Sequence, residues 1–384
     1  MKKYILVVLM KRIVFVVNID WFFLSHRLPL ALEAINRGFE VCLLTANSGK
    51  KSEIEEYGIN FIEVPFERSG KNLLHEWKCV SLLAKHYRRL NPDIIHHVTL
   101  KAALLGSFAA KISGHKNVIN AISGLGYNFT DGRNGPLQKL IRFMMRKSFK
   151  SDKFYFILQN PDDIEMMKSQ KLVPDNHYRL IKGSGVDLKE FPYTLPVIKD
   201  KIQILFPARI LYDKGVMELI EAAKTLEKKW KGKTLFILAG DCDENNKAVV
   251  SEEELNKHLI PDYIEWIKFR EDMILQYQQS DIVVLPSYRE GLPKSLIEAC
   301  AIGRPIITTD VPGCRECVID GYNGRMVPVK TVVPLANAIE ELCESKSLRD
   351  KMGSNSRVLA EQEFSIESVI EKTFLIYEEL LRSN

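Results

Sequence analysis

The pattern that most constrains the fold is an alternation of short apolar runs with longer amphipathic stretches. In the amino half, runs rich in β-branched residues, such as Ile13–Val17 and Val41–Thr45, are separated by helix-like segments such as Ser25–Arg37. Strands that alternate with helices favour a parallel sheet whose two faces are covered by helices. The amino half is therefore predicted to be a doubly wound α/β domain.

The same alternation restarts in the carboxyl half. Ile202–Pro207 and Ile282–Pro286 have the composition of buried strands, and Lys214–Lys229 and Pro293–Ile302 have the pattern of helices. We expect an α/β protein with two Rossmann-like, doubly wound domains that face each other across a cleft. The turn-rich stretch Gly183–Pro196 is typical of a link between domains.

The chain length agrees with this division. A chain of 384 residues is too long for one hydrophobic core and fits two domains of roughly 150–200 residues. We place an N-terminal Rossmann-like domain at 1–190, a C-terminal Rossmann-like domain at 191–364 and a final helix at 365–384. The apolar stripe of that helix must pack on something, and we expect it to cross back to the N-terminal domain.

Charge is divided unevenly between the two halves. Residues 1–190 hold 29 Lys and Arg against 18 Asp and Glu, a net of +11, and residues 191–384 hold 25 against 31, a net of −6. A basic amino half favours an anionic surface or ligand, and uneven solvation is the simpler alternative. Leu137–Lys150 has the pattern of a basic amphipathic helix that could lie on anionic lipid, although a helix that only covers the sheet has the same period.

The cysteines and the start of the chain bear on location. Seven cysteines without framework spacing suit a reducing compartment. Lys11 and Arg12 interrupt the apolar start and leave a run too short for a signal peptide or a membrane span, and Met10 is an alternative start. We expect a cytoplasmic protein, peripheral on the inner face of the cell membrane.

The first group of candidate site residues lies where a predicted strand gives way to a helix. Gly291 allows a close backbone approach, and Pro293 suits the first helical position because its missing N–H costs nothing there. The amides of Lys294, Ser295 and Leu296 would then face the cleft at the carboxyl edge of the sheet. Such a helix start is an anion site by backbone geometry alone.

Two carboxylates flank this anion site. Glu290 lies in the loop before the helix, and Glu298 lies about 7–8 Å into the helix at ~1.5 Å per residue. Carboxylates repel phosphate, so these two are better suited to accept hydrogen bonds from sugar and ribose hydroxyls. The simpler alternative, a solvated helix acid, applies mainly to Glu298.

Two cations follow the first strand of the carboxyl half. Arg209 and Lys214 bracket a short loop after Ile202–Pro207 and can both reach a ligand in the cleft. A diphosphate leaving group gains negative charge as its bond to a sugar breaks, so fixed cations act mainly on the transition state. One such contact at 4 Å is worth ~4 kcal/mol at an effective dielectric near 20, before desolvation. Positioned cations can therefore replace a metal.

The order of these motifs resembles the carboxyl domain of glycosyltransferase family four, which comprises retaining enzymes of the GT-B fold. The resemblance is strongest over residues 202–330 and extends through Gly185-Val186-Asp187 and the terminal helix. The motifs that carry it are Ala208-Arg209 with Lys214-Gly215, Ala239-Gly240-Asp241, Pro286-Ser287 with Glu290-Gly291 and Glu298-Ala299, and Pro312-Gly313.

This resemblance implies roles for the candidate residues. It places Arg209 and Lys214 on the donor diphosphate, Glu290 against the donor sugar and Glu298 on the ribose, in a retaining hexosyltransferase that needs no metal and no cofactor beyond its nucleotide-sugar substrate. Arg209, Lys214 and Glu290 are the catalytic candidates. The remaining donor-binding candidates, besides Glu298, are Gly185, Gly291, Leu292, Pro293, Lys294 and Ser295.

The amino half departs from the common family pattern. It lacks a Gly-Gly loop after its first strand, and Ser123-Gly124-Leu125-Gly126 stands where many members have a histidine. This variant resembles bacterial transferases that add N-acetylhexosamines to undecaprenyl-diphosphate glycans in surface-polysaccharide (O-antigen, capsule) and glycoprotein pathways. The resemblance implies a UDP-sugar donor and a lipid-linked or oligosaccharide acceptor. It makes 1–190 the acceptor-binding domain and 191–364 the nucleotide-sugar-binding domain.

Acceptor candidates are the polar and glycine residues near predicted strand ends that would face the cleft. For any single histidine, a local structural hydrogen bond is an equally good interpretation. The candidates are His26, Arg27, His97, Lys101, Gly124 and Gly126.

Other functions fit the architecture less well. A UDP-sugar epimerase would share both the two domains and the donor site. A two-lobed sugar-binding protein would carry a secretory signal, and none is evident. A nicotinamide dehydrogenase is not indicated, since no G-x-G-x-x-G follows the first strand of either half. We expect no nucleic-acid partner.

Overall fold

The computed structural model forms two compact units and describes residues 10–67, 72–125, 135–151, 153–173, 176–197, 199–244 and 246–382. Unit 1 consists of Met1–Ile181 with Ile370–Asn384, and unit 2 of Lys182–Val369. Residues 182–190, which the sequence analysis placed in the first domain, belong to unit 2 because Val186 bridges to Ser365 there. Gly126, most of the glycine-rich loop and the segment before Met10 lie outside the described residues.

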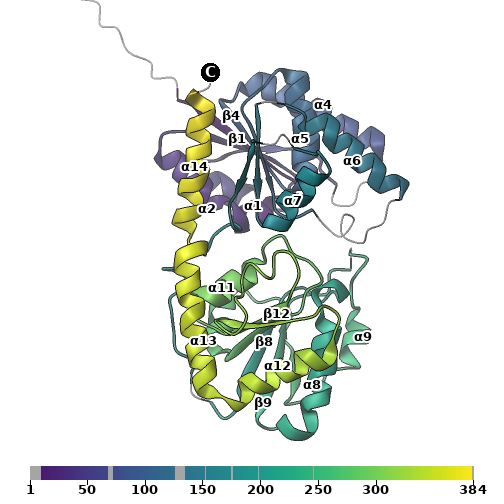
Figure 1. Cartoon of the computed structure of the whole chain (residues 1–384). Helices are drawn as coiled ribbons and strands as arrows, with labels where there is room; N and C mark the ends of the chain where they lie inside the picture. Colours follow the sequence, from purple (N-terminus) through teal and green to yellow (C-terminus); the bar gives the residue numbers. More distant parts are fainter. Residues whose placement is uncertain are drawn as a thin grey trace, which may run out of the picture. The chain divides into compact units, whose positions relative to one another are not determined.

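Unit 1 is built on a parallel sheet. Its described residues form seven strands in the order β3-β2-β1-β4-β5-β6-β7 (Figure 1). The strand order reverses direction at β1, which has β2 on one side and β4 on the other. The strands are β1 (Arg12–Val17), β2 (Glu40–Thr45), β3 (Asn60–Glu63), β4 (Ile94–Val98), β5 (Val118–Ile122), β6 (Phe154–Leu158) and β7 (Tyr178–Leu180).

Helices cover both faces of this sheet, as the alternation predicts (Figure 1). The single helix expected over Ser25–Arg37 is instead two, separated at Arg27, because Pro29 lacks an amide hydrogen and fits only the first turn of a helix. The helices are α1 (Asp20–His26), α2 (Leu28–Asn36), α3 (Lys51–Glu56), α4 (Leu73–Leu90), α5 (Leu100–Ser113), α6 (Pro136–Phe149), α7 (Pro161–Ser169) and most of α14 (Ile366–Arg382).

The C-terminal helix α14 packs on unit 1 from Ile370 onward. The hydroxyl of its buried Tyr377 hydrogen-bonds Nδ1 of His96 at 2.7 Å. The guanidinium of Arg37 lies 4.0 Å from the ring centroid of Phe374 and pairs with Glu371. The prediction that the last helix packs on the N-terminal domain is therefore confirmed.

Unit 2 repeats the architecture around a second parallel sheet. Its described residues form six strands in the order β10-β9-β8-β11-β12-β13. Here the strand order reverses at β8, which lies between β9 and β11. The strands are β8 (Ile202–Pro207), β9 (Thr234–Ala239), β10 (Ile264–Trp266), β11 (Ile282–Leu285), β12 (Ile306–Thr309) and β13 (Gly324–Val327).

The helices of unit 2 bury aliphatic faces against this sheet, and α8, for example, buries Leu219, Ile220 and Leu226. The helix expected over Lys214–Lys229 begins only at Val216, because Gly215 has a left-handed conformation that ends a short preceding turn. The elements are η2 (Tyr212–Lys214), α8 (Val216–Trp230), α9 (Glu252–Asn256), α10 (Met273–Gln279), α11 (Lys294–Ile302), α12 (Val332–Glu344), α13 (Lys346–Leu359) and η3 (Ala360–Phe364).

The core of unit 1 includes a close contact between α5 and β4, and a substitution there would test how tightly the two elements pack. A Cβ atom added to Gly106 would lie 2.2 Å from Nε2 of His97. His97 is fully buried, and both of its ring nitrogens are hydrogen-bonded, so it has little room to move. We therefore predict that Gly106→Ala lowers the free energy of unfolding by about 1–3 kcal/mol through overpacking.

Chemical denaturation of the wild type and of Gly106→Ala would check this prediction. Ile112→Ala is a matched control, since Ile112 lies on the same helix but is 45% exposed, and we expect it to change stability much less. Equal stability of the wild type and Gly106→Ala would contradict the packing described here.

Candidate functional site

The donor candidates of unit 2 gather at the carboxyl edge of its sheet. Because β8, β11 and β12 are parallel neighbours, the loops that follow them begin at the same edge. The strand order reverses between β9 and β11, and ligands of doubly wound sheets bind outside such reversal points. The sequence predicted this placement from strand ends alone.

Two glycines let these loops approach with no side chain between their backbones. A Cβ atom on Gly215 would lie 2.2 Å from the carbonyl oxygen of Pro286, and one on Gly313 would lie 2.5 Å from that of Glu290. Both glycines also have left-handed φ angles, which other residues rarely adopt. Amide hydrogen bonds from Tyr288 to Asp213 O at 2.9 Å and from Glu290 to Pro312 O at 3.1 Å join the same loops.

This packing brings Lys214 against Glu290. The ammonium group of Lys214 donates a hydrogen bond to Oε1 of Glu290, and the two side chains are only 19% and 13% exposed. The hydroxyl of Ser287 donates to the same oxygen at 2.7 Å. The pair is held between loops from two different strands, and its charges compensate each other.

Arg209 has a separate carboxylate partner. Its Nη1 lies 2.5 Å from Oδ2 of Asp243, which follows β9, and its side chain is 44% exposed. Arg209 and Lys214 therefore both end at the carboxyl edge of the sheet, each paired with an acid. A diphosphate could bind both cations by replacing those carboxylates.

Glu298 lies one turn into α11. Its Oε2 accepts a hydrogen bond from the hydroxyl of the buried Tyr277 at 3.1 Å, and its Oε1 is 3.6 Å from Nζ of Lys294. Burial raises the pKa of Glu298, and the nearby Lys294 and the Tyr277 hydroxyl oppose this rise. The side chain is not the fully solvated helix acid of the simpler alternative.

The start of α11 differs from the prediction. Pro293 precedes the helix as its N-cap, and the first helical residue is Lys294. The amide of Leu296, which the sequence analysis offered to an anion, donates instead to the carbonyl of Pro293 at 3.0 Å. This part of the prediction was wrong, because a tight first turn already uses that donor.

The other donor candidates lie around the same loop. Leu292 is 9% exposed, and its side chain packs so closely on Gly183 that a Cβ atom there would lie 2.6 Å from its Cδ2. A Cβ atom on Gly185 would lie 2.7 Å from Cα of Ile366, so this glycine is required where the chain packs against the first residues of α14. Lys294 and Ser295 occupy the first two positions of α11, and Gly291 lies in the loop before it.

The acceptor candidates of unit 1 do not form one group. His97 was expected to face the cleft, but its ring lies in the core, where Nδ1–H donates to Asn120 Oδ1 at 2.7 Å and Nε2 accepts from Tyr87 at 3.0 Å. Burial lowers the pKa of His97 to about 4, so the ring stays neutral. Strand position alone could not show which face of the sheet α4 and α5 would cover.

The remaining acceptor candidates have local partners. Arg27 is only 5% exposed and donates to the carbonyl of His26, and burial lowers its pKa to about 10. The ring of His26 stacks on Phe22 with 3.9 Å between centroids. Lys101 donates to Glu76 Oε1 at 2.7 Å, and Gly124 follows β5 at the carboxyl edge.

Sequence reasoning missed Asp243 and Tyr277. Each approaches its partner from a different loop or helix, 34 residues from Arg209 and 21 from Glu298. Neither of these separations along the sequence corresponds to the spacing of a known motif. Ser287, by contrast, stood inside a quoted motif, although its hydrogen bond to Glu290 was not foreseen.

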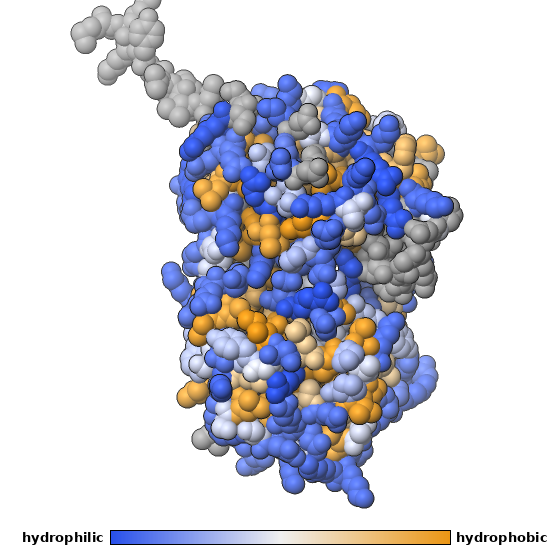
Figure 2. Space-filling model, in the orientation of Figure 1, coloured by the Kyte–Doolittle hydropathy of each residue, from blue (hydrophilic) through white to orange (hydrophobic). Residues whose placement is uncertain are grey.

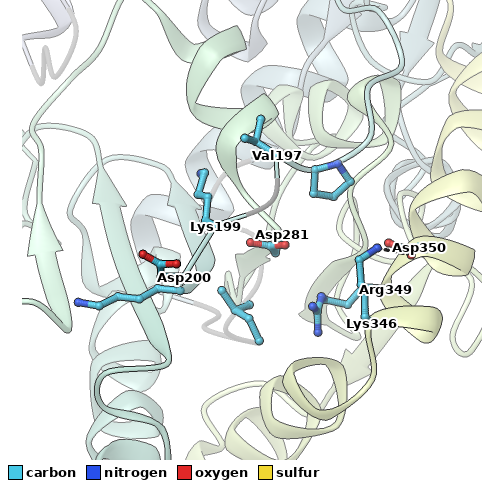
Figure 3. A pocket seen from close by; sticks show the side chains of 10 residues that line it. Val197, Lys199, Asp200, Asp281, Lys346, Arg349 and Asp350 are labelled. Carbon is cyan, nitrogen blue, oxygen red and sulfur yellow. Dashed lines mark hydrogen bonds and ion pairs between the residues drawn. The ribbon is translucent and has the colours of Figure 1, made fainter.

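A separate cavity of about 170 Å³ lies elsewhere in unit 2. It opens beside the first residue of β8 and the residue before β11, hence at the amino edge of the sheet, and none of the predicted site residues lines it (Figure 3). Its walls carry charges of both signs. The labelled charged residues around it are Lys199, Asp200, Asp281, Lys346, Arg349 and Asp350.

Neither a cluster of metal ligands nor a membrane-spanning helix is found among the described residues. In the part of the chain that the structure describes, no group of three or more His, Cys, Asp or Glu side chains is arranged to hold a metal ion. No described helix combines the length and the apolar character needed to cross a membrane.

Comparison with known proteins assigns a family to both units. Residues 189–359 match the family model "Glycosyl transferases group 1", and residues 12–160 match "Glycosyl transferase 4-like". A structure of Anabaena Alr3699/HepE in complex with UDP superposes with a TM-score of 0.76 at 18% identity, over 98% of this chain and 100% of that one.

Two curated relatives cover nearly the whole chain. The N,N'-diacetylbacillosaminyl-diphospho-undecaprenol alpha-1,3-N-acetylgalactosaminyltransferase of Campylobacter jejuni is 31% identical over 87% of this chain and 92% of the relative. The UDP-Gal:alpha-D-GlcNAc-diphosphoundecaprenol alpha-1,3-galactosyltransferase of Escherichia coli is 24% identical over 89% of each. Given this similarity and the two Rossmann-like units, the chain belongs to the glycosyltransferases of the GT-B fold.

Proposed function

We propose that this glycosyltransferase moves a sugar, an N-acetylhexosamine, from a UDP-sugar to an undecaprenyl-diphosphate-linked glycan in the synthesis of a bacterial surface polysaccharide or glycoprotein glycan. The observation that carries the proposal is the Lys214–Glu290 pair at the carboxyl edge of the second sheet, with Arg209 at the same edge. The names of the Campylobacter and Escherichia relatives support the acceptor class. The comparisons lend no support to the alternative of a UDP-sugar epimerase or a sugar-binding protein.

The two cations are proposed to bind the donor diphosphate. On binding, Lys214 and Arg209 would exchange the carboxylates of Glu290 and Asp243 for phosphate oxygens. As the bond between the sugar and the diphosphate breaks, the leaving oxygen gains charge, and a preorganised cation then stabilises the transition state more than the bound donor. This role needs no resident cofactor.

Glu290 is proposed to contact the donor sugar rather than to attack it. Its Oε1 accepts a hydrogen bond from Ser287 that would remain after Lys214 turns to the diphosphate, and this bond lowers its nucleophilicity. Retention would then follow from attack on the face that the diphosphate leaves. The acceptor oxygen forms its bond to the anomeric carbon, the bond to the phosphate oxygen breaks, and that oxygen takes the acceptor's proton.

Removal of either cation tests the diphosphate assignment. We predict that Arg209→Ala and Lys214→Ala each lower turnover at least about 100-fold, as the loss of one transition-state contact does elsewhere. Lys229→Ala is the control, since Lys229 is an exposed residue of the same unit that pairs with Glu340 and Glu344. Near-normal rates in folded Arg209 or Lys214 variants would exclude the assignment.

A substrate screen tests the function itself. UDP- and GDP-sugars are incubated with a synthetic prenyl-diphosphate-linked glycan, and both nucleotide release and the glycan product are measured. We expect release of UDP that depends on the acceptor, with an extended glycan as product. Interconversion of UDP-sugars without any acceptor would indicate an epimerase instead.

A lipid-linked acceptor requires the protein to reach the membrane surface, and we propose that unit 1 provides the contact. Helices α4 and α6 flank α5 and leave large apolar side chains exposed, namely Leu74 at 82% and Trp77 at 59% near the start of α4, and Leu140 at 44% and Phe143 at 55% in the first half and the middle of α6. Figure 2 shows hydrophobic residues among hydrophilic ones where Figure 1 draws these helices.

Basic residues accompany this apolar surface. Lys139, Arg146 and Lys147 are exposed on α6, which carries no acidic residue, and Lys78 is exposed on α4. The opposite side of α6 buries Met145 and Phe149 in the core, so the helix both covers the sheet and presents a basic, partly apolar face. Such a face suits the inner, anionic surface of a cell membrane.

Vesicle binding tests the membrane proposal. We predict that the protein binds vesicles with anionic lipid, that binding weakens as salt rises, and that Trp77→Ser with Phe143→Ser reduces it. Val333→Ser, which alters a 63% exposed apolar residue of unit 2, should bind like the wild type. Equal binding to neutral and anionic vesicles, or none to either, would contradict the proposal.

A further inference from the structure

The carboxylate of Glu298 is held by a residue that belongs to no glycosyltransferase motif quoted above. Tyr277 of α10 is 1% exposed, and its hydroxyl donates to Glu298 Oε2 at 3.1 Å. Because burial raises the pKa of Tyr277 well above its usual value, the hydroxyl keeps its proton throughout the working range. Tyr277 is therefore a permanent donor to Glu298.

The backbone of Tyr277 is itself fixed. The fully buried Arg304 donates from Nε to the carbonyl of Tyr277 at 2.9 Å and from Nη2 to that of Gln278 at 3.0 Å. The same guanidinium also donates to the carbonyl of Thr194 at 2.5 Å. The backbone at the end of α10 thus has little freedom, and burial leaves the Tyr277 ring little room to rotate.

Three groups influence the charge of Glu298. Lys294, one turn earlier on α11, and the Tyr277 hydroxyl favour the carboxylate, whereas burial and the negative charge of Glu190 disfavour it. In preorganised sites, a hydrogen bond from a neighbouring side chain commonly fixes the orientation of the group that binds the ligand. Without Tyr277, the carboxylate would keep Lys294 as its only favourable partner among these groups.

We propose that Tyr277 is a positioning residue for donor binding, which holds the Glu298 carboxylate in the one orientation that accepts the ribose hydroxyls of the nucleotide. The inference rests on the proposed function, in which Glu298 contacts the ribose. Tyr277 does not touch the donor in this proposal and acts only through Glu298.

The test compares Tyr277→Phe with Tyr263→Phe. Both tyrosines are buried in unit 2, and Tyr263 donates its hydroxyl to the carbonyl of Ala223 at 2.6 Å, so each variant loses one buried hydrogen bond and keeps its ring. UDP affinity is measured by titration calorimetry between pH 5 and pH 8, and thermal melting confirms that both variants are folded.

We expect Tyr277→Phe to weaken UDP binding about tenfold at neutral pH, as loss of a hydrogen bond to a charged group does. Its deficit should grow as pH falls, because the hydrogen bond favours the ionised carboxylate and its loss raises the pKa of Glu298 further. Protonation of UDP itself affects its binding to all variants in the same way and therefore cancels in the comparison. Tyr263→Phe should bind UDP like the wild type at every pH.

Nucleotide analogues and a double variant separate positioning from a general effect on structure. The wild type should prefer UDP to 2′-deoxy- or 3′-deoxy-UDP, and Tyr277→Phe should lose most of that preference. Glu298→Gln combined with Tyr277→Phe should bind no worse than Glu298→Gln alone. The inference would be overturned if Tyr277→Phe bound UDP more weakly by the same factor at all pH values and still preferred UDP to its deoxy analogues as the wild type does.

The same data distinguish this inference from the function on which it rests. If Glu298→Gln binds UDP as the wild type does, the ribose contact of Glu298 is wrong and the role of Tyr277 falls with it. If Glu298→Gln is impaired but Tyr277→Phe behaves like Tyr263→Phe, the ribose contact stands and only the role of Tyr277 is wrong.

Discussion

The ion pair between Lys214 and Glu290 is the interaction on which the proposed donor site depends. Both side chains are largely buried, and a buried charge without a partner costs several kcal/mol. Each residue therefore keeps the other in place, and Ser287 fixes the carboxylate further. In the proposed function, a diphosphate would take over the ammonium group because it carries at least as much negative charge as the carboxylate.

The predictable part of this molecule follows from the geometry of parallel sheets. Once the strand and helix order was recognised, the carboxyl ends of β8 and β11 had to meet at one edge, and Arg209, Lys214 and Glu290 follow those ends. The position of Glu298 followed from the rise of a helix. These deductions use only neighbouring residues and the strand direction.

The parts that sequence could not give depend on contacts between distant elements. His97 alternates with its neighbours along β4 like any strand residue, and its burial was decided by Tyr87 of α4 and Gly106 of α5. The early use of the Leu296 amide is a local detail with no unique sequence signal, whereas the helix break at Arg27 does have one in Pro29. Partners such as Asp243 and Tyr277 appear only when loops and helices are placed in three dimensions.

The glycine contacts of unit 2 limit how the loops at the proposed donor site can change. Gly215 accommodates the carbonyl of Pro286, and Gly313 accommodates that of Glu290, so the three loops fit one another as a set. If only the Glu290 loop is replaced by that of a relative, the new loop has a different backbone conformation, whereas the neighbouring glycines still fit the original loop. Chimeras that exchange all three loops together should therefore fold more readily than those that exchange one, and natural divergence in this family should be constrained in the same way.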